Sequence, residues 1–526
     1  MFNRKVSIRI ALSFVIFTFL ATALIAQDLA EPATAELKST KGKSAENVIE
    51  SMFPYASDGI RNSAVIWNTD IADAGTYLFA TTTSGSLTDM SAGTTQLVAA
   101  NADDTASAVT NIGFDFYFQG VRYSQFSVNS NGSVRLGSVA TSGTAYNPLG
   151  LASSSIITAY GADQRTHTTG KVHFKVTGTA GSRVVVIEFL NMQANFSTGG
   201  TADLTYQVRL SETTGVIEFV YGPMAMSTAG AADANSNSPQ FGFSSSNTTG
   251  NVGSITAAQS GAPAPTFDGA TAIPVDNLYV AGAITVLDSA ADGSRRTFAF
   301  TPPVPAGPTG LSFTAITPIA QTLNWTDNAV NEDLFAIYRS TDGINYSYVG
   351  SAAEDATTFN DTGLAPSTNY FYQVYAVSEG ALSTVLFGSQ ATSAPGNDTC
   401  NGAGGVWSSA GTWTDGSVPT ATDNVTIGTG CTVEVDITTA VAYNVTVNSG
   451  GTLQSPATGA TTTNNLTVSN NVTNNGTLDF STNGDTSGAI LTFGAGVNDV
   501  VLTEPEQQRM SERSQSQKAH ARRSLN

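Results

Sequence analysis

Two carboxylates in a repeated four-residue motif are the first candidates for chemistry in this sequence. The motif Val-Ile-Glu-Phe occurs at 186–189 and again at 216–219, and it places Glu188 and Glu218 in equivalent settings. Glycosidases use two neighbouring carboxylates as acid and nucleophile. In an alternating strand, however, a Glu between two buried apolar residues points to solvent. We therefore predict that the two motifs lie on antiparallel strands of one sheet, with both glutamates exposed and neither catalytic. Replacing either with Gln should then change stability by less than about 0.5 kcal/mol.

The three histidines are the next candidates, because histidine serves both as a metal ligand and as a general base. They are His167, His173 and His520. The first two are six residues apart across Gly170, so a hairpin there would let them face each other. A protein metal site needs three or four ligands, and no cysteine is near. No Gly-x-Ser-x-Gly elbow, phosphate-binding loop or Cys–His pair occurs. The sequence therefore predicts no catalytic site, no metal site and no bound cofactor.

Aromatic side chains could bind a sugar by stacking, provided that they are exposed. Aromatic residues dominate protein cores, so we expect most of the candidates to be buried. The candidates are Tyr117, Tyr123, Tyr160, Trp407 and Trp413.

The composition limits the scaffold that must position these groups. Charged residues make up 12% of the 526 residues, whereas hydrophobic residues make up 41%. The polar surface must therefore come from Thr, Ser, Asn and Gly, which favour strands and turns over helices. The formal net charge of -19 argues against nucleic acid as a partner, because phosphates require Lys and Arg. The chain length suggests about three or four domains, and the sequence predicts that they are all-β.

The N-terminus has the order of a secretory signal. Three basic residues precede an apolar run over 10–25, and small residues follow at Ala21, Ala23 and Ala26. This order predicts cleavage near Ala26 and a protein that is secreted or held at the cell surface. The alternative is an uncleaved membrane anchor, for which the run is at the short end. No other run in the sequence is apolar and long enough to span a membrane.

Residues 61–302 are built from short segments in which apolar and polar residues alternate, the pattern of half-buried strands. Asn131-Gly132 and Thr214-Gly215 supply turns between them. This region is predicted to be a β-sandwich. The clearest segments are 111–120, 123–137, 171–178, 182–191, 204–212 and 215–222.

This region also resembles part of large exported proteins of bacteria that use type IX secretion. The resemblance is carried by IGFDFYFQGVRYSQFSVNSNGSVRLG, ITAYGADQ, RVVVIEFLN and TGVIEFVYG. A second resemblance, to the extracellular domain of nidogen, is carried by ITAYGADQRTHTTGKVHF. Both imply an extracellular sandwich, and neither implies a known chemistry.

Residues 306–395 resemble a fibronectin type III domain. LNWTDNAVNEDLFAIYRSTDGINYSYVG supplies the buried Trp325, and LAPSTNYFYQVYAVSEG supplies the later strands. Tyr370 matches the tyrosine corner of that family, in which the ring packs inside and the hydroxyl bonds to the backbone. The resemblance implies that Trp325 and Tyr370 are core residues and that the segment folds alone. No Arg-Gly-Asp tripeptide is present, so integrin binding is not implied.

Residues 397–500 begin with GVWSSAGTWTDGSVPTATDNVTIGTGCTVEVD, which resembles the opening of bacterial parallel β-solenoids. NVTI at 424, NVTV at 444 and NLTV at 465 recur at offsets of 20 and 21 residues, a coil length that suits a solenoid. A third small sandwich is the alternative. Asn-x-Thr triplets such as that at Asn444 are glycosylation acceptors only in a eukaryotic secretory route. In a bacterial strand they reflect composition or form rungs of an Asn ladder. No Lys or Arg occurs between 397 and 499, which argues against a lyase site for uronates.

Cys400 and Cys431 are the only cysteines, and they lie 31 residues apart. In an exported chain we expect them to form a disulfide that clamps the first coil of the solenoid. The alternative is two buried thiols, because free Cys packs as a small hydrophobe.

The function that this sequence favours is binding or adhesion outside the cell, without catalysis. An extracellular protein or a glycan would be the partner. The alternatives are carbohydrate-binding modules of a polysaccharide-degrading system, and a degrading enzyme with a catalytic solenoid. The predicted organisation is a signal peptide (1–26), a flexible leader (27–60), a β-sandwich (61–302), a fibronectin type III domain (306–395), a solenoid-like segment (397–500) and a disordered tail (501–526).

Overall fold

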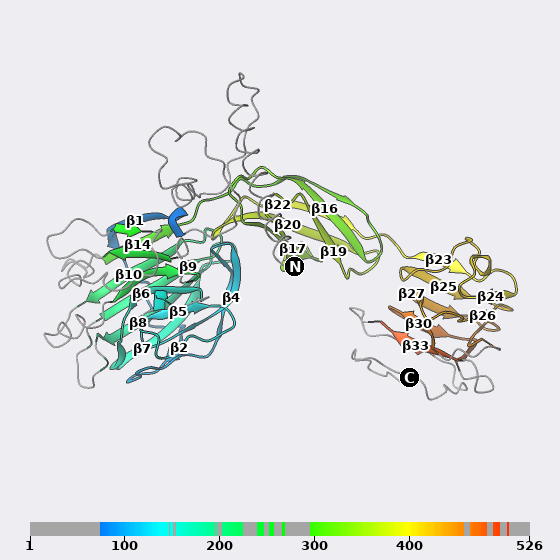
Figure 1. Ribbon diagram of the computed structural model, residues 1–526, viewed down its shortest axis with the longest axis horizontal. Coiled ribbons are helices and arrows are strands. Elements are labelled where there is room, and N and C mark those ends of the chain that lie inside the picture. Colours follow the sequence, from blue (N-terminus) through cyan, green and yellow to red (C-terminus); the bar gives the residue numbers. More distant parts are fainter. Residues whose placement is uncertain are drawn as a thin grey trace, which may run out of the picture. The chain divides into compact units, whose positions relative to one another are not determined.

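The computed structural model describes the chain from residue 74 onward, with gaps (Figure 1). The predicted signal peptide, the leader and His520 lie outside the described residues. Leu502–Thr503 form a strand inside the region predicted to be a disordered tail, so that boundary is wrong. The described residues are 74–146, 148–150, 154–194, 196, 202, 204–224, 239–246, 252–256, 266–268, 295–456, 463–480, 488–494 and 502–503.

Within these residues the protein is almost entirely β, which confirms the predicted fold class. The helical elements described are three short 3-10 turns at Ala74–Thr76, Pro148–Gly150 and Ala410–Thr412. The scarcity of helix follows from a sequence rich in Thr, Gly and Asn, which favour strands and turns.

The N-terminal region is a sandwich of two seven-stranded sheets (Figure 1). The first has the order β1 (Leu78–Gly85), β14 (Arg295–Thr301), β10 (Ile217–Met224), β9 (Leu204–Ser211), β8 (Val184–Gln193), β7 (Arg165–Thr177) and β2 (Thr95–Val98). The second has the order β13 (Thr266–Asp268), β12 (Val252–Thr256), β11 (Gln240–Ser244), β6 (Ile156–Gly161), β5 (Ser133–Leu136), β4 (Val121–Val128) and β3 (Thr110–Phe118).

Aromatic rings fill the space between these two sheets. Phe189 and Tyr206 stack on the inner face of the first sheet, with ring centroids 4.7 Å apart. Tyr160 reaches Tyr206 from the second sheet at 6.1 Å. Apolar burial of this kind is the main stabilising term of a sandwich.

The second region is a smaller sandwich. One sheet has the order β15 (Thr309–Thr314), β16 (Ala320–Thr326) and β19 (Thr358–Thr362). The other contains β18 (Ser347–Ala353), β17 (Leu334–Ser340), β20 (Asn369–Ser378) and β21 (Ala381–Leu382), with β22 (Leu386–Ala391) also paired to β20. Trp325 and Tyr370 lie in its core, and the Tyr370 hydroxyl accepts a hydrogen bond from the Ala365 amide at 2.8 Å.

One face of the smaller sandwich contacts the first sandwich through polar and aromatic groups. The Tyr338 hydroxyl donates to Asp115 at 3.0 Å and lies 3.2 Å from the Tyr117 hydroxyl. The Arg122 guanidinium lies 4.1 Å from the centre of the Tyr348 ring. These groups keep Tyr117 buried, so it offers no stacking surface to a sugar.

The third region is a parallel β-solenoid, so the prediction of a solenoid is confirmed and the alternative of a third sandwich is wrong. Strands from successive coils pair in parallel in three sheets. The first sheet has β23 (Gly396–Thr399), β25 (Asp423–Ile427), β28 (Asn444–Val447), β31 (Val472–Asn474) and β34 (Leu502–Thr503). The second has β24 (Gly404–Val406), β26 (Thr432–Glu434), β29 (Thr452–Gln454) and β32 (Thr477–Asp479), and the third has β27 (Ala440–Ala442), β30 (Asn464–Val468) and β33 (Ala489–Phe493).

Candidate functional site

Glu188, the first carboxylate singled out from the sequence, is buried rather than exposed. Its side chain is 7% accessible, and one carboxylate oxygen lies 2.7 Å from Nε2 of His173. The other oxygen accepts a hydrogen bond from the Gln207 amide at 2.8 Å. Nδ1 of His173 lies 3.0 Å from the Thr94 hydroxyl. The prediction that both glutamates are exposed is therefore wrong for Glu188, and a buried polar network takes the place of an open acid.

The burial of Glu188 results from a strap, residues 86–94, which joins the two edge strands of the same sheet. β1 and β2 lie at opposite edges of the seven strands, so the strap must cover six strand spacings, about 29 Å. Nine nearly extended residues can span that distance, at about 3.3 Å each. The strap crosses the outer face of the sheet, where the Thr88 amide and carbonyl pair with the Gln207 side chain at 3.0 and 2.8 Å. Lys175 donates to the Asp89 carbonyl farther along.

Glu218 does not form a catalytic pair with Glu188. The two motifs lie in one sheet, on β8 and β10, but β9 runs between these strands. Since each is antiparallel to β9, β8 and β10 run parallel to each other, and the predicted antiparallel arrangement is wrong. Glu218 is partly exposed and lies 3.9 Å from the Arg209 guanidinium.

The two histidines of the first sandwich do not face each other across a hairpin either. Both lie on the single strand β7, which has a register irregularity between Thr166 and Lys171 where the sequence suggested a turn. His167 bonds locally to the Thr169 hydroxyl at 3.0 Å, whereas His173 pairs with Glu188 on the next strand.

Replacing Glu188 with Gln is expected to lower the free energy of unfolding by about 2 kcal/mol, because it removes a charge-assisted hydrogen bond from a buried network. This value replaces the change of less than about 0.5 kcal/mol that was expected for an exposed Glu188. Urea unfolding of the full chain provides the measurement. Glu218→Gln is the matched control and should stay within about 0.5 kcal/mol. Equal effects of the two substitutions would contradict the structural role of Glu188.

The other aromatic candidates are buried or half-buried. Tyr160, Trp407 and Trp413 are fully buried, and Tyr123 is half-buried with its hydroxyl 2.6 Å from that of Ser155. Trp407 and Trp413 pack edge to face, and the Trp413 indole donates to the Trp407 carbonyl at 3.0 Å. Both belong to the core of the solenoid.

Two groups of three carboxylates lie close together in the described residues, and neither group was predicted from the sequence. In each group the oxygens lie within 4.8 Å of one another. In the first group, burial and then the charges of Asp103 and Asp104 raise the pKa of Asp163 to about 6. The acidic pair 103–104 and the ADQ segment were the only local hints of it. The groups are Asp103, Asp104 and Asp163, and Asp327, Glu332 and Asp355.

Asp398 occupies an interior position at the start of the solenoid. It pairs in register with Val425, and it is 3% exposed. Burial, followed by the carboxyls of Asp415 and Asp423 within hydrogen-bonding reach, raises its pKa to about 7. In the unfolded chain the pKa of an Asp carboxyl is about 4. Between that pH and about pH 7, the folded chain therefore keeps the Asp398 proton, whereas the unfolded chain has released it.

The stability of the solenoid is therefore expected to fall as the pH rises from about 4 to about 7, because a raised carboxyl pKa stabilises the fold only while the group is protonated. Asp398→Asn should remove this slope and stabilise the solenoid by about 4 kcal/mol at pH 8, at about 1.4 kcal/mol for each unit of the pKa difference. Thermal unfolding at pH 4 and pH 8 tests this, and near pH 4 the two proteins should differ least. A variant that is less stable than the parent at pH 8 would contradict it.

The outer face of the first solenoid sheet carries two columns of uncharged polar side chains. In one column the side chains of Asn397, Asn424 and Asn444 bond in sequence, with Nδ2 to Oδ1 distances of 3.1 and 2.7 Å. Asn470 continues the ladder at 2.9 Å. Asn444 is thus a rung, one of the two roles left open for the Asn-x-Thr triplets.

The second column consists of threonines, which stand directly opposite one another in the parallel register. Its members are half-buried or exposed, and no hydrogen bond joins their hydroxyls to other groups in the described part of the chain. They are Thr399, Thr426, Thr446 and Thr473.

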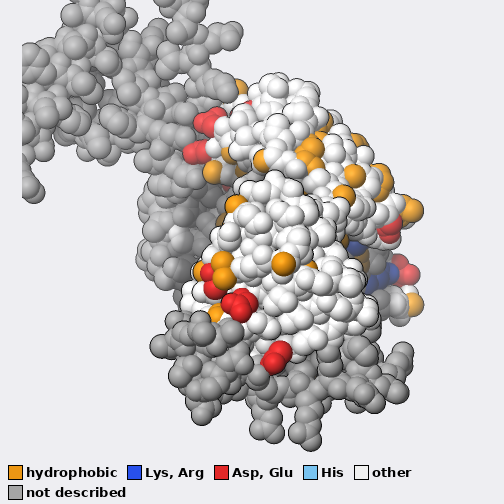
Figure 2. All heavy atoms as spheres, turned by 90° about the vertical axis from the view of Figure 1, so that its right-hand side faces the viewer, with side chains coloured by type: hydrophobic (Ala, Val, Ile, Leu, Met, Phe, Trp, Pro, Cys, Tyr) orange, Lys and Arg blue, Asp and Glu red, His pale blue; other side chains and the backbone are white. Residues whose placement is uncertain are grey.

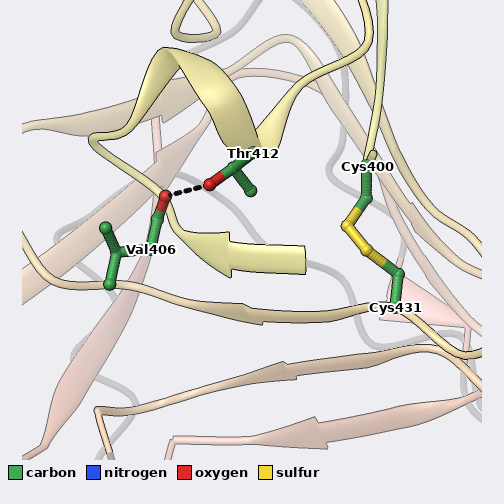
Figure 3. The surroundings of a disulfide bond; sticks show 4 residues. All are labelled: Cys400, Val406, Thr412 and Cys431. Carbon is green, nitrogen blue, oxygen red and sulfur yellow. Dashed lines mark hydrogen bonds between the residues drawn. A yellow bond between two sulfur atoms is a disulfide. The ribbon is translucent and has the colours of Figure 1, made fainter. Parts of the chain in front are cut away.

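The two cysteines form a disulfide at the start of the solenoid, with their Cα atoms 6.4 Å apart (Figure 3). Beside it, the Thr412 hydroxyl donates to the Val406 carbonyl at 2.8 Å and closes the turn that contains the short helix. The bond thus joins the segment after β23 to the segment before β26.

Family models match two of the three regions. Residues 76–301 match the model described as NIDO related, and residues 412–492 match that of the G8 domain. The first match covers the sandwich, and the second covers most of the solenoid.

Individual relatives each match a fifth of this chain or less. A poly(3-hydroxybutyrate) depolymerase from Ralstonia pickettii is 36% identical over 104 residues, which are 20% of this chain and 20% of that enzyme. The chain thus matches about a fifth of that relative's length. Among solved structures, an Fn3-like protein from Clostridium thermocellum is 32% identical, covers 16% of this chain and 90% of its own, and has a TM-score of 0.15. An FN3 domain of human collagen XX is 27% identical, with coverages of 17% and 91% and a TM-score of 0.15.

Among the residues that the structure describes, none form a helix with the length and apolar character needed to cross a membrane.

Proposed function

We propose that this protein is an extracellular or cell-surface binding protein, in which β modules act as spacers and binding surfaces without catalysis. The observation that carries the proposal is the partly exposed, regular and uncharged face of the first solenoid sheet, in a chain whose candidate catalytic carboxylate is covered by the strap. The NIDO-related, fibronectin-like and G8 modules are consistent with binding outside the cell. The disulfide supports an oxidising compartment, because disulfides persist mainly there.

Export is tested by expressing the full chain in a bacterial host and fractionating the culture. We expect the protein outside the cell or on its surface, with a mature N-terminus at or close to Gln27, because the small residues before it fit signal cleavage. A protein that stays in the cell and retains Met1 would contradict the proposal. A variant with three Asp residues inserted in the apolar run at 10–25 is the control and should not be exported.

A second candidate function is that of a carbohydrate-binding part of a polysaccharide-degrading system. The columns of Asn and Thr on the solenoid favour it, because their amides and hydroxyls match the hydrogen-bonding groups of sugars. Binding without release of reducing ends would support this role, whereas release of sugars by the purified chain would show a catalytic function.

A further inference from the structure

We propose that the outer face formed by β23, β25, β28 and β31 binds a neutral polysaccharide, with the sugar chain lying across the strands along the solenoid axis. This inference rests on the proposed function of extracellular binding and names the ligand class and the surface. We call this surface the Asn/Thr face; it consists of Asn397, Asn424, Asn444, Thr399, Thr426, Thr446 and Thr473.

The Asn/Thr face is a regular and rigid array. Parallel pairing places equivalent residues of successive coils opposite one another, so the threonines repeat at the strand spacing of about 4.8 Å. Thr is branched at Cβ and loses little further freedom when a ligand binds. The amides of the Asn ladder are held by their neighbours at 3.1 and 2.7 Å. A ligand therefore meets groups that are already ordered, which lowers the entropic cost of binding.

Charge excludes several classes of partner. The solenoid region from 397 to 499 has no Lys or Arg and eight Asp or Glu residues, so polyanions such as nucleic acids or uronates would be repelled. In Figure 2 the side of the solenoid that carries β24 and β26 faces the viewer, and its surface is mainly uncharged with a few separate acidic groups. The sheet of β24, β26, β29 and β32 includes Glu434 and Asp479, whereas both columns of the Asn/Thr face are neutral.

The same face lacks what a protein or lipid partner would require. Protein interfaces have a buried apolar and aromatic core, and membrane surfaces bind apolar or basic side chains. Neither column contains such a residue. The Asn/Thr face instead presents groups that both donate and accept hydrogen bonds. These are the Thr hydroxyls and the donor and acceptor positions of the Asn side chains that the Asn ladder does not use. Sugar hydroxyls have the same double capacity, which leaves a neutral polyhydroxyl chain as the matching ligand.

The ligand would be held by many equivalent weak contacts rather than by one strong contact. Each hydrogen bond to a sugar replaces one to water, so a single contact adds little affinity. Three successive coils offer the same pair of an Asn and a Thr, and the fourth adds Thr473, so a long chain can engage them all at once. We therefore expect affinity to rise with the length of the oligosaccharide, with no measurable binding of a monosaccharide.

The test uses the full chain and the depletion of protein from solution by insoluble cellulose, chitin, xylan and β-1,3-glucan, with alginate immobilised on beads as the anionic comparison. Thr426→Val with Thr446→Val removes two hydroxyls but keeps side-chain shape and strand preference. We expect binding to at least one neutral polymer, and a Kd that is about tenfold weaker in this double variant. The matched control is Thr432→Val with Thr452→Val, in the same coils but on the second sheet, which should bind like the parent.

Thermal unfolding of all variants shows whether the fold is retained. Should the double variant misfold, Thr446→Lys, a single change at a partly exposed position, takes its place and should also weaken binding. Retention of no neutral polymer, stronger retention by alginate, or equal losses in both double variants would overturn the inference. If the exported protein still binds cells or other proteins in those cases, the proposed function stands, whereas absence of export and of any binding would overturn both.

Discussion

Replacing Trp325 with Ala is expected to destabilise the fibronectin-like domain by about 3–5 kcal/mol, which is a large part of the stability of a small domain. The side chain is 5% exposed and belongs to a core cluster with Leu323, Phe335 and Ile337. Its ring centroid lies 5.3 Å from that of Phe335. Truncation to Ala removes the largest side chain of this core and leaves a cavity that strands fixed by hydrogen bonds cannot close.

Urea unfolding of the full chain, followed by hydrogen exchange of β16, β17 and β20, measures this loss where it arises. Ile344→Ala is the control, because this side chain is 80% exposed and its truncation should change stability by less than about 0.5 kcal/mol. The assignment of Trp325 to the core would be refuted if both variants unfolded at the same denaturant concentration. That residues 306–395 fold alone stays a prediction, and Tyr338 and Tyr348 would lose their contacts with the first sandwich in the isolated segment.

The elements that could be predicted from the sequence are those determined by local periodicity. Alternation at period two located the strands around Phe189 and Phe219, because one buried face is enough to define a half-buried strand. The offsets of 20 and 21 residues between the Asn-x-Thr segments predicted stacked coils, and the segments that begin at Asn424 and Asn444 pair in register. The third segment joins a different sheet, because β30 pairs with β27 and β33.

The wrong predictions concern which segment covers the outer face of a sheet. The local sequence pattern holds no information about this. Alternation correctly directs Glu188 away from the sandwich core, yet the side chain is buried because the strap crosses the outer face. The contact between Thr88 and Gln207 joins residues 119 positions apart. No prediction was made for Asp398, whose two acidic neighbours likewise come from later turns of the chain.

The candidate site was predictable only in part, for the same reason. Asn-x-Thr triplets were visible in the sequence, and an Asn ladder was one of two readings. That the threonines form a neutral column depends on which strands share a sheet and on their register. The aromatic residues considered as stacking platforms were expected to be mostly buried, and the solenoid indeed uses Trp407 and Trp413 to fill the interior of its first coils.

Removing the disulfide is expected to destabilise the solenoid by about 3–4 kcal/mol, because the bond closes a loop of about 30 residues and restricts the unfolded chain. Cys400 and Cys431 are both buried, and their Cα atoms lie 6.4 Å apart, within the range that a disulfide spans. The first coil has no neighbour before it, so its strand edge depends on local restraints more than later coils do. The bond restrains that coil directly, as the Cys400 amide also donates to the Thr426 carbonyl at 2.9 Å.

The measurement is urea unfolding of the full chain followed by hydrogen exchange of β25 and β28, with and without reductant. The chain contains only these two cysteines, so reduction changes nothing else. The variant with Cys400→Ala and Cys431→Ala should unfold near the midpoint of the reduced parent in both conditions, which separates loss of the bond from effects of the reductant. The expectation fails if the oxidised and reduced parents share one midpoint, or if alkylation of the oxidised protein labels two free thiols.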